Sequence, residues 1–136
     1  FFLQPHQRTP QRLAQPGGNV DYERFWQQVM VPLRQGVSFS YHPYDCSVQQ
    51  LTDAVEVLPT SIVFVEGSYS CHPALWEGYD LHIFLTVQPT EQLRRIAIRN
   101  GQQGLKVFRE RWIPLEERYF SAFSVQQRCE LCFATD

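Results

Sequence analysis

Two short apolar runs, Ser61–Val65 and Leu81–Val87, constrain the fold more than any other feature of the sequence. Both are rich in β-branched and other apolar residues, with little alternation between apolar and polar positions. Such runs are typical of strands that are buried on both faces, and these strands belong to parallel sheets. Pro89 follows the second run and suits the first position of a helix. We therefore expect an α/β fold in which a parallel sheet is flanked by helices.

Apolar residues at helical spacing predict a first helix that begins at Asp21 and ends at Gly36. The negative charge of Asp21 suits the positive end of the helix dipole, and Asn19 is a candidate N-cap. Pro32 should kink or shorten the last turn, because its ring removes a backbone donor.

Two further helices and a last strand are predicted downstream. One helix begins at Pro89 and ends at Gly101, and the next spans residues 105–123 with a kink near Pro114. Leu131–Ala134 is a short apolar segment that we interpret as a final strand.

The remaining segments carry no clear period. Residues 4–18 are punctuated by proline and glycine and predict a loop, and residues 39–58 are predicted to be irregular. We expect residues 1–136 to form a single domain.

Composition and charge exclude several function classes. Hydrophobic residues make up 43% of the chain and its net charge is −2, so we expect a globular protein without a basic face for nucleic acid. The longest apolar runs are too short to span a bilayer, and the first residues do not have the pattern of a signal peptide. Four cysteines without disulfide-scaffold spacing indicate free thiols. We therefore expect a cytoplasmic protein that binds neither nucleic acid nor a membrane.

Glu66 directly follows the first apolar run, and Gly67 lets the backbone turn away. Ligands of open parallel sheets bind beyond the carboxyl ends of the strands. A carboxylate at this point can orient a substrate or hold a magnesium ion through water. A plain surface turn is the alternative interpretation of Glu66.

Arg95 and Arg99 are four residues apart on the second predicted helix, so they share one face. Two guanidinium groups on one face can grip phosphate oxygens and offset the charge of a transferring phosphoryl group. An exposed, solvated face explains the same spacing equally well.

Tyr44 and Asp45 lie in a cluster with Tyr41 and His42 that combines ring faces with polar groups. Such a cluster suits a planar base and a sugar hydroxyl, although aromatic residues in a loop often only cover a core.

His72 and His82 have no acidic partner at metal-ligand spacing, and Cys129 and Cys132 form a single CxxC pair, which is only a weak zinc or redox signal.

A phosphate-binding loop requires glycines followed by Lys and Ser or Thr. The chain contains no Gly-Lys pair, and Lys106 is its single lysine. The chain also begins with Phe1 rather than Met, so we expect the natural N-terminus to lie upstream.

Several segments together nevertheless resemble a known family over essentially the whole chain. They occur in this order: Phe1–Leu3, Pro16–Tyr22, Pro43–Asp45, Ile62–Gly67, Tyr79–Leu85, Leu93–Ile96, Arg99–Asn100 and Trp112–Glu117. The sequence is similar to the uridine kinase-like branch of the P-loop kinases.

This resemblance implies a P-loop NTPase-like fold of the nucleoside kinase type, truncated at its N-terminus, of which this chain is the C-terminal portion. It implies transfer of the γ-phosphoryl group of ATP, with Mg²⁺, to the 5′-hydroxyl of a ribonucleoside, most plainly uridine or cytidine. A P-loop strand would lie between the two apolar runs and pair with both. The Asp-Asp pair that precedes Phe1-Phe2 in the family, and that faces the hydroxyl and the magnesium ion, is absent here.

The resemblance also implies roles for individual residues. Asn19 and Asp21 fall where the family's ribose-contacting Asp lies, and which of the two does this job stays open. Tyr44 and Asp45 match the base pocket. The three residues matched to the catalytic region are the strand-end Glu66 and the lid arginines Arg95 and Arg99.

Two alternatives stay open. Nicotinamide riboside kinase, or another small-metabolite kinase, shares the Phe-Phe and Glu-Gly features. The chain could instead be a catalytically inactive binding or assembly module. A homo-oligomer is compatible with either interpretation.

Overall fold

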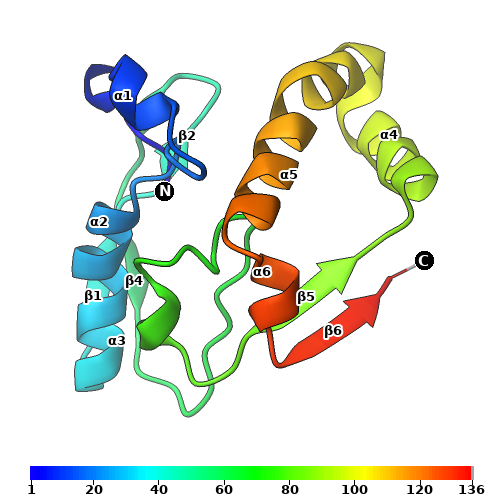
Figure 1. Cartoon of the computed structure of the whole chain (residues 1–136). Helices are drawn as coiled ribbons and strands as arrows, with labels where there is room; N and C mark the ends of the chain where they lie inside the picture. Colours follow the sequence, from blue (N-terminus) through cyan, green and yellow to red (C-terminus); the bar gives the residue numbers. More distant parts are fainter. Residues whose placement is uncertain (136) are drawn as a thin grey trace. The chain divides into compact units, whose positions relative to one another are not determined.

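The computed structural model describes residues 1–135 and shows a small mixed α/β protein, with helices and one short pair of parallel strands (Figure 1). The chain divides into two compact units. The N-terminal unit is Phe1–Tyr79, and the C-terminal unit begins at Asp80. The interpretation of the chain as a single domain stays a prediction.

The N-terminal unit opens with two short helical segments, so the prediction of a loop over residues 4–18 was wrong in part. The 3-10 helix η1 spans Pro5–Gln7, and α1 spans Pro10–Leu13. Thr9 caps α1 by accepting a hydrogen bond from the Arg12 N–H. Proline begins both segments, which suits a position without an intrahelical donor.

The predicted helix from Asp21 to Gly36 is confirmed as three consecutive segments. They are α2 (Tyr22–Phe25), the π-helical turn η2 (Trp26–Met30) and α3 (Val31–Gln35). Gly36 ends the helix in the left-handed conformation, with φ 66°.

The N-cap of this helix is Asp21 rather than Asn19, because the Asp21 carboxylate accepts a hydrogen bond from the Arg24 N–H. The wide turn η2 directly precedes Pro32. Proline has no N–H for the carbonyl group four residues earlier, and here the Val31 N–H bonds to Trp26 O, five residues back.

Residues 39–58 are not irregular as predicted but form two antiparallel strand pairs. The outer pair joins β1 (Phe39–Tyr41) to β4 (Val55–Val57). The inner pair joins β2 (Tyr44–Asp45) to β3 (Gln50–Leu51). The two pairs form a nested hairpin.

The prediction of a buried strand at Ser61–Val65 was wrong. The backbone there is irregular, and the side chains of Ile62 and Phe64 are 72% and 85% exposed. A strand requires a neighbouring strand for its backbone hydrogen bonds, and an apolar pattern does not provide one. Among the described residues no strand pairs with this run. The unit ends with the 3-10 helix η3 (Trp76–Gly78).

The two strands predicted in the C-terminal unit are confirmed, and they pair in parallel (Figure 1). They are β5 (Ile83–Thr86) and β6 (Leu131–Ala134), with Ile83 opposite Leu131. Exposure alternates along β5 and Leu85 is 61% exposed, so the expected burial of β5 on both faces was wrong.

Helices connect β5 to β6, as expected for a parallel pair. In chain order they are α4 (Pro89–Val107), the π-helical turn η4 (Phe108–Trp112), α5 (Ile113–Ala122) and α6 (Val125–Arg128). The predicted break at Gly101 is confirmed by its φ of 69° inside α4. As at Pro32, a wide turn precedes Pro114.

Each unit has its own buried apolar residues. Those of the N-terminal unit are Leu3, Val20, Val29, Met30, Tyr69 and Leu75, and those of the C-terminal unit are Ile96, Tyr119 and Val125. In the part of the chain that the structure describes, no helix is both long and apolar enough to cross a membrane.

Candidate functional site

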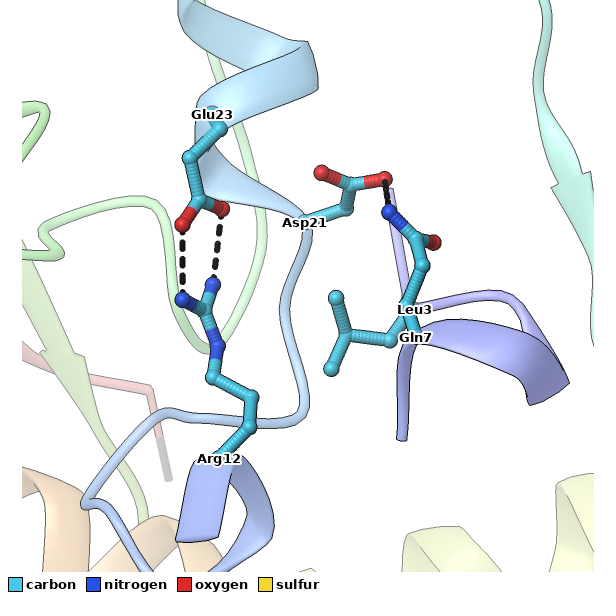
Figure 2. Close-up of a pocket in the computed structure, with 5 residues that line it drawn as sticks. All are labelled: Leu3, Gln7, Arg12, Asp21 and Glu23. Atoms are coloured by element: carbon cyan, nitrogen blue, oxygen red, sulfur yellow. Dashed lines mark hydrogen bonds and ion pairs between the residues drawn. The ribbon is translucent and has the colours of Figure 1, made fainter. Parts of the chain in front are cut away.

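A polar pocket of about 380 Å³ lies in the N-terminal unit. Its lining residues, drawn in Figure 2, are Leu3, Gln7, Arg12, Asp21 and Glu23. Four of the five carry charged or amide side chains. The pocket therefore suits a ligand with several hydrogen-bonding groups rather than an apolar one.

Asp21 is the most deeply buried polar residue of this pocket, with 3% of its surface exposed. Its Oδ1 atom accepts from the Arg24 N–H at 3.2 Å, and its Oδ2 atom accepts from Arg24 Nε and Gln7 Nε2, each at 3.2 Å. A carboxylate has about four lone-pair positions, and these bonds use three. One acceptor position, on Oδ1, is therefore left for a donor from a ligand.

Arg12 fastens the loop that leads to Asp21. Its guanidinium donates two hydrogen bonds to the Glu23 carboxylate, at 2.6 and 2.7 Å (Figure 2), and others to the carbonyl oxygens of Gly18 and Val20. It also lies 4.2 Å from the ring centroid of Tyr22. Burial favours a higher pKa for the Glu23 carboxyl, but hydrogen bonds from Arg12, the backbone and Tyr22, together with the positive charge of Arg12, outweigh it, so the pKa lies below its ordinary value.

Two buried donors close to Asp21 in sequence have no hydrogen-bond partner among the described residues. They are Asn19 Nδ2 and Arg24 Nη2. A buried donor without a partner costs free energy of about 1–3 kcal/mol. A ligand that accepts hydrogen bonds would remove that cost.

Tyr44 lies on β2, and its phenol oxygen accepts a hydrogen bond of 2.6 Å from Arg8 Nη2. Arg8 Nε also donates to the carbonyl oxygen of Leu3, a residue of the pocket wall. The structure thus connects Tyr44 to the pocket through Arg8.

The Asp45 side chain accepts hydrogen bonds from Ser47 within the hairpin loop. Its Oδ1 atom accepts from the Ser47 N–H at 2.7 Å and from the Ser47 hydroxyl at 2.6 Å. These bonds lower the pKa of the Asp45 carboxyl. Such a turn fixes the hairpin loop between β2 and β3.

Glu66 does not end a strand, because the run before it is irregular, and its side chain is exposed. The basis on which Glu66 was predicted as a strand-end residue is therefore absent. Its proposed role rests on the family resemblance alone.

Arg95 and Arg99 lie on α4 before the break at Gly101, so they share one helix face as predicted. Arg95 pairs with Glu91 at 2.7 Å and donates to the Thr135 carbonyl oxygen. Arg99 donates to Asn100 Oδ1 at 2.8 Å.

Glu91 is a shared partner on this face, since Arg94 binds the same carboxylate at 2.6 Å. Hydrogen bonds from Arg94 and then Arg95 lower the pKa of Glu91 to about 2. The carboxylate is thus charged at neutral pH and competes with any phosphate for these arginines.

Sequence reasoning missed Gln7, Arg8, Arg12 and Glu23. One signal could have found Arg12. It lies in a segment without acidic residues that directly precedes Asp21 and Glu23. A basic residue just before two acidic residues favours a loop closed by an ion pair, and Arg12 forms one with Glu23.

Metal ligands and disulfides are not part of this site. The described residues contain no group of three His, Cys, Asp or Glu side chains that could hold a metal ion. All four cysteines are free thiols, as predicted.

No protein-family model matches the chain, and no curated protein matches it.

Proposed function

We propose that this chain is the nucleoside-binding part of an ATP-dependent ribonucleoside kinase, with uridine or cytidine as the substrate. One observation carries the proposal: a buried carboxylate with one remaining acceptor position, on Asp21, lies two residues from an unpartnered buried amide donor, on Asn19. Each hydroxyl of a ribose can donate one hydrogen bond and accept others. A carboxylate together with an amide donor is therefore complementary to a sugar diol.

The arginines of the C-terminal unit would supply positive charge for the phosphates. A planar guanidinium binds phosphate oxygens in pairs, and stabilising the charge of the transferring group is the main catalytic effect in phosphoryl transfer. Arg95 would exchange its bonds to Glu91 and Thr135 for phosphate oxygens, whereas Arg99 bonds to the neighbouring Asn100 amide and lies over the Phe108 ring.

ATP would supply the phosphoryl group, with Mg²⁺ neutralising its charge. The described residues contain no group of three His, Cys, Asp or Glu side chains that could hold a metal ion, and the ion would be bound together with ATP. The 136 residues also contain no Gly-Lys pair for a phosphate-binding loop. We therefore expect the 136-residue chain by itself to transfer no phosphate.

A phosphorylation assay tests the proposal. The complete gene product would be incubated with Mg²⁺ and ATP and with each member of a panel: uridine, cytidine, adenosine, guanosine and nicotinamide riboside. We expect a 5′-monophosphate from uridine or cytidine. Phosphorylation of nicotinamide riboside alone would show that nicotinamide riboside, and not a pyrimidine nucleoside, is the substrate. The absence of product with every acceptor would refute the proposal.

A second candidate function is an assembly module without catalytic activity. The exposed side chains of Ile62 and Phe64 favour it, because an apolar run in open solvent is typical of a surface that another chain covers. Sedimentation of the wild type and of the Phe64→Ser variant tests this candidate. A wild-type oligomer that dissociates to monomers in the Phe64→Ser variant would support this candidate, and a monomer in both cases would contradict it.

A further inference from the structure

Arg8 donates hydrogen bonds to three separate parts of the N-terminal unit. Its Nε atom bonds to the Leu3 carbonyl oxygen at 3.0 Å, its Nη2 atom to the Tyr44 phenol oxygen at 2.6 Å, and its Nη1 atom to Gln49 Oε1 at 3.2 Å. A guanidinium is a rigid planar fork, so three bonds fix the relative positions of all three acceptors. One side chain thus holds the pocket wall, β2 and the end of the hairpin loop together.

The backbone conformation of Gln49 is a second observation on this loop. It has a φ of 55°, in the left-handed region that residues other than glycine rarely adopt. Non-glycine residues in this region concentrate at functional sites, where surrounding contacts hold them in place. Here the hairpin loop is fixed on one side by the turn of Asp45 and Ser47, and on the other by the bond from Arg8 to Gln49.

The bonds from Arg8 decide which groups remain for a ligand. The Tyr44 phenol oxygen already accepts from Arg8, so its own O–H is left to donate. The Gln49 carbonyl oxygen also accepts from Arg8, so its NH₂ group is left to donate. Two side chains that can each donate or accept are thereby set as donors.

We propose that Arg8 is a positioning residue for base recognition, which fixes the Tyr44 hydroxyl and the Gln49 amide as a pair of hydrogen-bond donors. The ligand edge that fits is one with acceptors, such as the carbonyl oxygens or the unprotonated ring nitrogen of a pyrimidine. This inference rests on the proposed nucleoside kinase function. It goes beyond that function by assigning Arg8 and Gln49, which neither the sequence patterns nor the resemblance singled out.

Kinetics of the complete gene product test the inference, with Arg8→Gln, Arg8→Lys, Gln49→Ala and Tyr44→Phe as variants. Arg34→Gln is the matched control, because Arg34 is an exposed arginine of the same unit with one long bond, of 3.4 Å, to a carbonyl oxygen. Arg8→Gln should raise the KM for the nucleoside about tenfold or more, the effect of losing about 1.4 kcal/mol of binding. The KM for ATP should stay within about twofold of the wild-type value. The nucleoside KM of Arg8→Lys should lie between those of the wild type and Arg8→Gln, because an ammonium group keeps the charge but cannot reproduce the planar fork.

A double variant separates positioning from simple loss of stability. If Arg8 acts through the phenol, adding Tyr44→Phe to Arg8→Gln should raise the nucleoside KM by much less than Tyr44→Phe does alone. Thermal unfolding of each variant identifies any that fail to fold. If Arg8→Gln fails to fold, Arg8→Lys and Gln49→Ala still test the inference.

The outcomes are distinct. A nucleoside KM that Arg8→Gln changes by less than about twofold, an equal rise for both substrates, or additive effects with Tyr44→Phe would overturn the role of Arg8 and leave the proposed function standing. Wild-type protein that phosphorylates no nucleoside would overturn the proposed function and this inference with it.

Discussion

Replacing Asp21 with Asn tests the electrostatics of the pocket without changing its shape. Asn and Asp cap helices about equally well, so the substitution keeps the cap of α2 and removes the charge. The partner guanidinium of Arg24 is itself largely buried, with 11% of its side chain exposed, and it would lose its counter-ion. Removing one member of a buried ion pair costs about 3–5 kcal/mol.

Arg24 keeps part of its stabilisation through bonds to the His42 carbonyl oxygen and to Gln28 Oε1. We therefore expect Asp21→Asn to lower the free energy of unfolding by about 2–4 kcal/mol. That is a large share of the roughly 5–15 kcal/mol that stabilises a typical domain. Glu23→Gln is the control, because Glu23 is 55% exposed and its pair with Arg12 should contribute at most about 1 kcal/mol.

Urea denaturation followed by tryptophan fluorescence measures both variants. Trp26 and Trp76 lie in the N-terminal unit and Trp112 in the other, so a Trp112→Phe background limits the signal to the N-terminal unit. An Asp21→Asn cost within about 0.5 kcal/mol of the Glu23→Gln cost would refute the argument that Asp21 and Arg24 form a buried, mutually dependent pair.

Three further predictions concern other positions. Burial, with a smaller contribution from Arg12, lowers the pKa of His72 to about 4. The share of the free energy of unfolding that depends on neutral His72 should therefore be fully present above pH 6.5 and should fall by up to about 3 kcal/mol as the pH drops from 6.5 to 4. His72→Phe should flatten that pH dependence in acid denaturation. Gly18→Ala should destabilise the chain strongly in thermal unfolding, because the added Cβ would lie 1.9 Å from the Arg12 carbonyl oxygen; Gly36→Ala, at a left-handed position with open space, should cost only about 1 kcal/mol, and equal costs would contradict the crowding at Gly18. Arg99→Ala in the complete gene product should lower kcat by orders of magnitude with little change in melting temperature, and an unchanged kcat would reject its role at the phosphates.

Elements with local determinants were predictable from the sequence. The helix from Asp21 to Gly36 and the start of α4 at Pro89 each follow from residues within one or two turns. The strands β5 and β6 were also found, because each is a bounded apolar run.

Features that depend on distant partners were not predictable in the same way. Ser61–Val65 has a strand-like composition, but its conformation depends on a neighbouring strand that the run does not encode. The strands between residues 39 and 57 were missed because each contains only two or three residues, too few to show alternation.

The candidate site shows the same division. Asp21 was placed at the start of a helix because an acidic residue there is a local signal, whereas its role in the site was predicted from the family resemblance alone. Arg8 was missed because its contacts with Tyr44 and Gln49 lie 36 and 41 residues away in the sequence. Long-range side-chain bonds of this kind leave no periodic pattern.

The most direct test of the proposed sugar site is a comparison of two ligands by calorimetric titration of the 136-residue chain. Uridine carries both ribose hydroxyls, and 2′,3′-dideoxyuridine carries neither. Because Asp21 has a free acceptor position and Asn19 a free buried donor, we expect the dideoxy compound to bind at least about tenfold more weakly. Equal affinity for the two compounds, or no binding of uridine, would contradict the assignment of this pocket to a ribonucleoside.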